Sequence, residues 1–191
     1  MKPSILIVND TNRPMDAARH ALEAAGYEVI DEVDSAKALL HAVSIRMPDV
    51  VIIDTNSPSR DTLEQLSVMH TEAPRPVVMF SNEADRDTIR KAVAAGVSAY
   101  IVDGLSTERL APILEVAKAQ FEQKHEMAVR LANAEQQLAD RKLIEKAKGI
   151  LMARKGLSEQ EAFEQLRSLS MKQGQKLVDL ARQLVSMADL L

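Results

Sequence analysis

Short apolar runs alternate with segments of helical periodicity along the first 105 residues. The apolar runs are rich in Val and Ile, which is typical of buried strands, whereas apolar residues three and four apart are typical of amphipathic helices. The predicted strands cover residues 4–10, 27–30, 50–53, 76–80 and 99–102. The predicted helices cover residues 14–25, 35–46, 61–70, 85–95 and a segment from residue 107 onward. This alternation predicts an α/β doubly wound fold with five parallel strands.

The helical pattern continues well beyond residue 107. No Gly or Pro occurs from Ile113 to Lys148, and the alternating spacings of four and three are typical of a coiled coil. We therefore predict a coiled-coil signal helix over residues 107–140. Its seam comprises Leu110, Leu114, Ala117, Phe121, Lys124, Ala128, Leu131, Glu135 and Leu138. Because small and polar residues interrupt this seam, we expect a weak homodimer that can be conditional; a linker helix packed on its own chain is the alternative.

The last fifty residues predict a small unit of three helices. The first helix ends at Gly156, and a capping box formed by Ser158 and Glu161 begins the second. The third helix is expected from about Gln173. The chain is therefore divided into a domain at residues 1–120, the coiled-coil segment at 107–140 and a terminal domain at 131–191.

Composition excludes several classes of function. The chain has no Cys, and its four His lie far apart, which excludes disulfides, Cys nucleophiles, thiolate metal sites and any local two-His metal motif. No apolar run approaches the ~20 residues of a membrane span, so we expect a cytoplasmic protein without membrane contact. The carboxylates form no complete catalytic set, so we expect neither an enzyme nor a required cofactor.

Polar residues follow the predicted strands at their carboxyl ends, where ligand sites of parallel sheets lie. The candidates there are Asn9, Asp10, Asp54, Ser81 and Asp103, with Tyr100 in the fifth strand. Over about residues 1–120 this arrangement resembles the receiver domain of two-component response regulators, which implies a flavodoxin-like fold. The resemblance also implies that Asp54 is the phosphoacceptor, that Ser81 senses the phosphoryl group and that Tyr100 is an aromatic switch.

Two departures from the receiver pattern change the implied chemistry. The acidic pair that holds Mg²⁺ in the family is Asn9-Asp10 here, which leaves Asp10 and Asp54 as ligands of a weakened Mg²⁺ site. The family's Lys-Pro after the fifth strand is Asp103-Gly104, so a carboxylate replaces the cation that neutralises the phosphoryl oxygens. We expect weak or absent phosphorylation and a pseudo-receiver that serves as a dimerisation or docking scaffold; a working phospho-switch is the alternative.

Positive charge is concentrated in the terminal domain. The net charge of the chain is -4, yet residues 141–182 hold ten basic and five acidic side chains. Arg141, Lys148 and Lys155 are seven residues apart and, at about 100° per residue, form one stripe ~21 Å long. Such a stripe can follow successive phosphates, and a solvated helix surface is the alternative. Gly149 inside this helix indicates a close approach by RNA backbone or by the neighbouring helix.

The terminal sequence resembles an RNA-binding family. The run Ile144-Glu-Lys-Ala-Lys-Gly-Ile-Leu-Met152, followed by Ser158-Glu-Gln-Glu-Ala-Phe163, resembles the ANTAR domain of transcription antiterminators. This resemblance and the cationic stripe together give the candidate RNA-binding residues Arg141, Lys148, Gly149, Met152, Lys155 and Arg167. The receiver-like domain, the signal helix and the ANTAR-like tail together are similar to NasT-type regulators. This similarity implies binding to leader mRNA hairpins, an indirect effect on RNA polymerase, control of nitrate and nitrite assimilation genes, and a NasS-type nitrate-sensor partner.

Two other classes of function stay open. A DNA-binding transcription factor with a C-terminal helix-turn-helix predicts tight binding to duplex DNA. A protein-interaction module predicts binding to neither nucleic acid. Competition between leader RNA and double-stranded DNA distinguishes these classes from an antiterminator.

Overall fold

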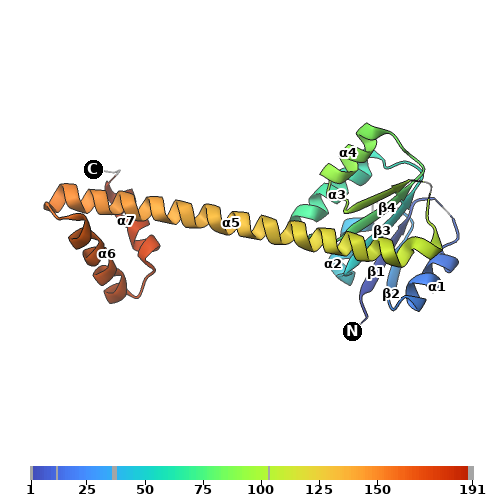
Figure 1. Cartoon of the computed structure of the whole chain (residues 1–191), viewed down its shortest axis with the longest axis horizontal. Coiled ribbons are helices and arrows are strands. Elements are labelled where there is room, and N and C mark those ends of the chain that lie inside the picture. The colour runs from blue at the N-terminus through green and yellow to red at the C-terminus, as the bar shows by residue number, and fades with distance from the viewer. Residues whose placement is uncertain (1, 12, 36–37, 103, 189–191) are drawn as a thin grey trace. The chain divides into compact units, whose positions relative to one another are not determined.

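The computed structural model describes residues 2–11, 13–35, 38–102 and 104–188 and divides the chain into two compact units. The first unit covers Met1–His125 and the second covers Glu126–Leu191. Helix α5, Leu110–Lys155, begins in the first unit and ends in the second (Figure 1). The predicted signal helix and the first helix of the predicted terminal domain are therefore parts of one helix.

The sheet of the first unit has five parallel strands, as predicted (Figure 1). They are β1 Ser4–Asn9, β2 Glu28–Val33, β3 Val50–Thr55, β4 Val77–Ser81 and β5 Ala99–Val102. Their order is β2-β1-β3-β4-β5, so the chain reverses direction across the sheet between β1 and β3. Asn9 at the end of β1 is in register with Asp54 of β3, which brings the two candidate residues to the same edge.

Four shorter helices complete the first unit: α1 Asp16–Ala24, α2 Leu39–Arg46, α3 Arg60–Glu72 and α4 Arg86–Ala94. The side chains of Ser59 and Asp85 cap α3 and α4 by accepting hydrogen bonds from backbone N–H groups. The expected bounds of 27–30 are wrong for β2, which extends to Val33. This edge strand contains half-buried and exposed residues but no buried one, and its sequence has no continuous apolar run to mark its length.

The core of the first unit consists of two apolar clusters, formed by alternate residues of the strands and thus lying on opposite faces of the sheet. Helix α5 contributes Leu110, Leu114 and Ala117 to the cluster that contains Phe80. The first three positions of the predicted coiled-coil seam therefore pack within their own chain. For these three residues the predicted contact between two chains is wrong.

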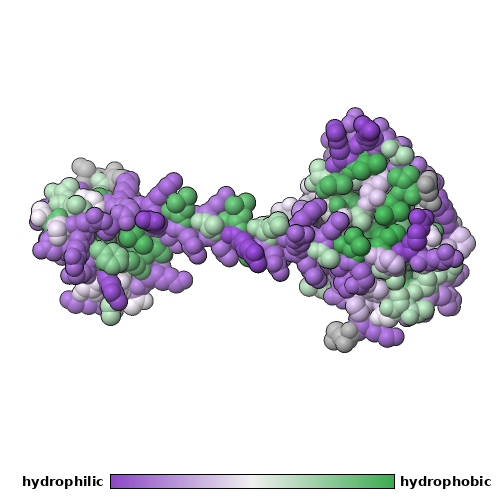
Figure 2. All heavy atoms as spheres, in the orientation of Figure 1, coloured by the Kyte–Doolittle hydropathy of each residue, from purple (hydrophilic) through white to green (hydrophobic). Residues whose placement is uncertain are grey.

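The middle of α5 contributes nothing to these apolar clusters, because every residue from 122 to 139 is exposed. Large apolar side chains interrupt its hydrophilic surface (Figure 2). They are Met127, Val129, Leu131 and Leu138. At about 100° per residue, Met127, Leu131 and Leu138 lie within about 40° of one another on the helix, and Val129 lies on the opposite side. Neither α5 nor any other described helix is long and apolar enough to cross a membrane.

The second unit packs the end of α5 against α6 Glu159–Gln173 and α7 Leu177–Ala188. Its buried apolar residues are Ala147, Leu151, Ala162, Leu166, Leu180, Ala181 and Val185. Ser158 and Glu161 form the predicted capping box of α6. The third helix begins at Leu177 and not near Gln173, because Gly174 ends α6 in the left-handed conformation with φ of +63°.

Candidate functional sites

Asp54 is the centre of the receiver site, at the carboxyl end of β3. Its side chain is only 1% exposed. Thr11 Oγ1 donates a hydrogen bond to Asp54 Oδ2 at 3.0 Å, whereas Asp54 Oδ1 has no hydrogen-bond partner among the described residues. The N–H of Asp10 donates to the Asp54 carbonyl at 2.8 Å, and Asp10 Oδ2 accepts from Thr55 Oγ1 at 3.3 Å. The structure thus brings Asp10 and Asp54 together.

Arg13 is a residue of this site that the sequence did not reveal. It lies on the loop between β1 and α1, and its Nη1 is 3.9 Å from Asp54 Oδ1. Its Nη2 donates to Asn56 Oδ1 at 3.2 Å. Asn9 Nδ2 donates to the Arg13 carbonyl at 2.8 Å, so Asn9 holds this loop. The only sign in the sequence was a cation three residues after Asp10.

The two hydroxyl candidates bind the backbone of neighbouring loops. Ser81 Oγ donates to the Asn56 carbonyl at 3.0 Å and accepts from the Glu83 N–H at 3.1 Å. Tyr100 Oη donates to the Glu83 carbonyl at 2.9 Å. Ser81 and Tyr100 are therefore linked through the segment that follows β4. Asp103, the remaining candidate, lies outside the described residues.

The site offers two carboxylates, a number that Mg²⁺ accepts when water completes its shell, but a fixed cation beside Asp54 disfavours the ion in this arrangement. Mg²⁺ requires near-octahedral oxygen ligands. Asp10 and Asp54 are the two expected carboxylate ligands, and the described part of the chain contains no group of three or more His, Asp or Glu side chains that could hold a metal ion. The Arg13 guanidinium beside Asp54 is a fixed positive charge that opposes a second cation at the same oxygen.

Lys148 is not part of an exposed cationic stripe, and that prediction is wrong. Its side chain is 9% exposed, and its Nζ lies 2.9 Å from Glu145 Oε2 and 2.7 Å from Glu159 Oε1. The hydrogen bond to Glu159, followed by that to Glu145, raises the pKa of Lys148. The same contact with Lys148 lowers the pKa of Glu159. Lys148 thus connects α5 to the first turn of α6.

The exposed face at the end of α5 is centred on Gly149. At about 100° per residue, Gly149 lies opposite the apolar face of the helix, and Lys142, Met152 and Ala153 share its side. A Cβ placed on Gly149 would meet no described atom within 4 Å beyond its chain neighbours and the backbone of its own helix. The neighbouring helix therefore does not approach Gly149, which removes one of the two explanations for a glycine at this position. Lys142 was not identified from the sequence, although its angular position was available there.

The remaining candidates for RNA contact are exposed. Arg141, Lys155 and Arg167 make no ion pair with any residue that the structure describes. Residues 141–182 contain five acidic side chains, and four of them already have partners. Glu145 and Glu159 pair with Lys148, Asp179 pairs with Arg182, and Glu161 belongs to the capping box of α6. The other exposed cations without an ion pair in the described chain are Lys142, Arg154, Lys172 and Lys176. The second unit therefore keeps most of its positive charge on its surface.

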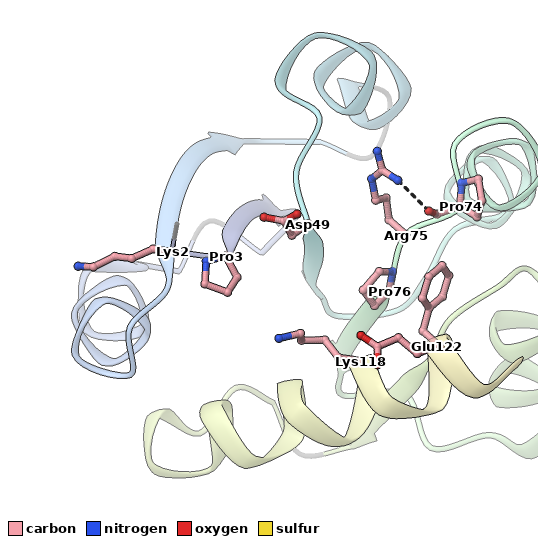
Figure 3. Close-up of a pocket in the computed structure, with 9 residues that line it drawn as sticks. Lys2, Pro3, Asp49, Pro74, Arg75, Pro76, Lys118 and Glu122 are labelled. Carbon is pink, nitrogen blue, oxygen red and sulfur yellow. Dashed lines mark hydrogen bonds between the residues drawn. The ribbon is translucent and has the colours of Figure 1, made fainter. Parts of the chain in front are cut away.

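A pocket lies at the opposite edge of the sheet, where β1, β3 and β4 begin (Figure 3). It is lined by Lys2, Pro3, Asp49, Pro74, Arg75, Pro76, Lys118, Phe121 and Glu122. Ser4 donates hydrogen bonds to Asp49 Oδ2 from both its N–H and its Oγ, and Arg75 donates to the Pro74 carbonyl. Lys2, Arg75 and Lys118 point in different directions, so they do not converge on one ligand position (Figure 3).

Comparisons with known proteins agree with the two units. The response regulator receiver domain family matches residues 5–115, and the ANTAR domain family matches residues 132–185. The chain is 31% identical over 157 residues to the transcriptional regulatory protein PdtaR of Mycobacterium tuberculosis, a match that covers 82% of this chain and 76% of PdtaR. It is 35% identical over 74 residues to the nitrate regulatory protein of Klebsiella oxytoca, covering 39% of this chain and 19% of that protein.

Solved structures support the fold of the first unit. The CheY-like receiver domain protein of Methanospirillum hungatei aligns with a TM-score of 0.56 at 23% identity, over 65% of this chain and 99% of that chain. A response regulator of Thermotoga maritima aligns with a TM-score of 0.55 at 21% identity, over 62% of this chain and 99% of that chain. With a receiver fold in its first unit and both domain families matched in order, the chain belongs to the response regulators that combine a receiver domain with an ANTAR domain.

Proposed function

We propose that the protein is a transcription antiterminator that binds hairpins in leader mRNA through its second unit. The observation that carries this proposal is the surplus of exposed cations there, which have no acidic partner in the described chain. Unpaired cations exchange counterions for RNA phosphates, whereas a merely solubilising surface intersperses charges of both signs. Bound hairpins would prevent a terminator stem from forming, so that RNA polymerase continues.

The RNA-binding surface consists of the exposed face of α5 around Gly149, which carries Lys142, and of the exposed cations Arg141 and Lys155 that border this face. A glycine allows RNA backbone to approach the helix closely. Met152 is partly exposed on the same face and offers an apolar contact to an unstacked base of a hairpin loop. Lys148 supports this surface indirectly, because its ion pair with Glu159 connects α5 to α6. Arg167 of α6 adds a further exposed cation.

Gly149→Ala is expected to change stability and RNA binding in opposite directions. The free energy of unfolding of the second unit should rise by about 0.5–1 kcal/mol, because alanine favours a helix over glycine and its Cβ meets open space. Affinity for a leader hairpin should fall several-fold, because the added methyl group holds the RNA backbone away. Urea unfolding followed by circular dichroism and a hairpin-binding assay measure the two effects.

The matched control for this substitution is Ala139→Gly, in the exposed middle of the same helix. It should lower stability by a similar amount and leave RNA affinity unchanged. If Gly149→Ala stabilises the unit and binds RNA as tightly as the native chain, RNA does not approach this glycine.

The exposed middle of α5 supports pairing with a second copy of the chain. Leu131 is 61% exposed and Leu138 is 55% exposed, and both lie on the predicted seam. Burying such residues against the same face of another α5 removes apolar surface from water. A dimer carries two RNA-binding units, so its second hairpin contact is effectively intramolecular.

Replacing both Leu131 and Leu138 by lysine is expected to produce a monomer, because each dimer would then bury four additional charges in its seam. Affinity for an RNA with two hairpins should fall at least about 10-fold, and affinity for one isolated hairpin should stay the same. Analytical ultracentrifugation and binding to the two RNAs measure these effects. Val129→Lys, at an exposed position on the opposite side of the helix, is the control and should remain dimeric. Equal loss on both RNAs would contradict the role of the dimer.

We further propose that the protein controls nitrate and nitrite assimilation genes and has a NasS-type nitrate-sensor partner. It is supported by the similarity to the nitrate regulatory protein of Klebsiella oxytoca and by an Asp54 site that departs from the phosphorylated pattern. Such a pseudo-receiver is suited to control by sequestration. Co-purification with a nitrate-sensor protein, and release of the complex by nitrate, tests this step. A complex that ignores nitrate would contradict it.

Competition for binding tests the proposed function against the two other classes. Labelled leader RNA should be displaced by unlabelled hairpin RNA and not by the same sequence as duplex DNA. Displacement by duplex DNA would favour a helix-turn-helix factor, and binding to neither would favour a protein-interaction module.

A further inference from the structure

We propose that Arg13 is the built-in counter-charge of Asp54, supplied from the loop between β1 and α1 in place of both a cation after β5 and a divalent metal ion. The inference concerns the first unit and does not depend on RNA binding by the second.

Asp54 requires a positive partner where it lies. Its side chain is 1% exposed, and its Oδ1 makes no hydrogen bond within the described residues. A buried carboxylate without a counter-charge is strongly destabilising. Arg13 Nη1, at 3.9 Å, is the one cationic atom of the described chain within ion-pair distance of that oxygen. Arg13 Nη2 donates a hydrogen bond to Asn56 Oδ1, which orients the guanidinium toward the site.

The glycine after β5 makes room for this guanidinium. A Cβ on Gly104 would lie 3.2 Å from Arg13 Nη1, which is a tight contact. Gly104 has φ of +77°, whereas a proline is restricted to φ near about -65°. The proline of the receiver's Lys-Pro pair could therefore not adopt the backbone conformation of Gly104. Its side chain would also occupy space next to the Arg13 guanidinium. The loss of that pair and the presence of Arg13 form one coupled arrangement.

Asn9 belongs to the same arrangement. Its Nδ2 donates to the carbonyl of Arg13 at 2.8 Å, which fixes the loop that carries the guanidinium. An ionised carboxylate at residue 9 has no proton to donate and would repel that carbonyl. Each departure from the receiver pattern, at residue 9 and at residue 104, thus favours the placement of Arg13 over the binding of a metal ion.

Tyrosine fluorescence provides a test of the first unit within the full chain. The protein has two Tyr and no Trp, and Tyr27 and Tyr100 both lie in the first unit. The native chain should have the same melting temperature in EDTA and in millimolar MgCl₂. Arg13→Ala should melt roughly 3–5 °C lower than the native chain in EDTA. The loss is modest because the arginine is partly solvated. In MgCl₂ this variant should recover part of the lost melting temperature. Arg13→Lys should retain most of the native value.

Two further variants identify the cause of the loss. Arg60→Ala removes an exposed arginine of the same unit that pairs with Glu64, and it should leave the melting temperature nearly unchanged. Asp54→Asn added to Arg13→Ala should recover most of the loss, because no buried charge then needs a partner. The proposal is overturned if Arg13→Ala melts like Arg60→Ala, if the double variant recovers nothing, or if MgCl₂ stabilises the native chain as much as it stabilises Arg13→Ala.

Discussion

Reversing the charges of Lys142 and Lys155 to glutamate is expected to weaken binding to a leader hairpin by about 100-fold, roughly tenfold for each residue. Both side chains are exposed on α5 and make no ion pair with described residues, so each reversal replaces attraction to phosphate by repulsion. Two lost phosphate contacts should also reduce the slope of log affinity against log salt concentration by about 1.4. Fluorescence anisotropy with labelled hairpin RNA across a salt series measures both quantities.

The matched control reverses two exposed cations of the first unit, Arg60 and Lys91, and gives the same change in net charge. If non-specific attraction dominated, this control would lose as much affinity as the double variant on α5. Equal losses, or an unchanged salt slope after reversal of Lys142 and Lys155, would rule out the proposed surface.

Lys148→Glu is expected to destabilise the second unit rather than to remove an RNA contact. The substitution would place three carboxylates together at the junction of α5 and α6, where Lys148 now binds Glu145 and Glu159. We expect the melting temperature of this unit to fall by roughly 5–10 °C. Far-UV circular dichroism should detect the early loss of helix, while tyrosine fluorescence of the first unit stays unchanged.

Two controls separate charge from position in this experiment. Lys148→Met should be milder, because Glu145 and Glu159 are largely exposed and can regain water. Lys155→Glu, the same reversal at an exposed site of the same helix, should change the melting temperature little. A variant Lys148→Glu that melts like the native chain but no longer binds RNA would restore Lys148 as a direct contact.

Much of the fold was predictable because the central strands are apolar on both faces. Strands β1, β3 and β4 are buried along most of their length, so their residues form continuous runs of Val and Ile. Edge strand β2 has no such run, and its end at Val33 was therefore missed. The three apolar positions at the start of α5 fit a coiled coil and a sheet-packing helix equally well, and periodicity alone does not distinguish these contacts.

The candidate sites were less predictable because they depend on contacts between distant residues. The angular position of Lys148 placed it at the border of the apolar face, but its ion pair with Glu159 depends on the turn at Gly156, which lies between them in the chain. Arg13 carries no motif, and it reaches Asp54 only because the strand order places β1 beside β3. Gly149, in contrast, was noticed from helix propensity alone, and the structure shows that the chain leaves space around it.

In the proposed dimer, the helical order of the exposed middle of α5 depends on the concentration of the chain. Every residue from 122 to 139 is exposed, so no burial reinforces the backbone hydrogen bonds there, and helix propensity with a few side-chain pairs such as Arg130–Glu126 leaves a stretch of this length only marginally ordered in water. Pairing with a second chain would add the missing free energy, and mass action would make that contribution rise with concentration. Dilution should therefore loosen this segment before it affects either folded unit, so that amide hydrogen exchange between residues 122 and 139 accelerates as the concentration of the chain falls.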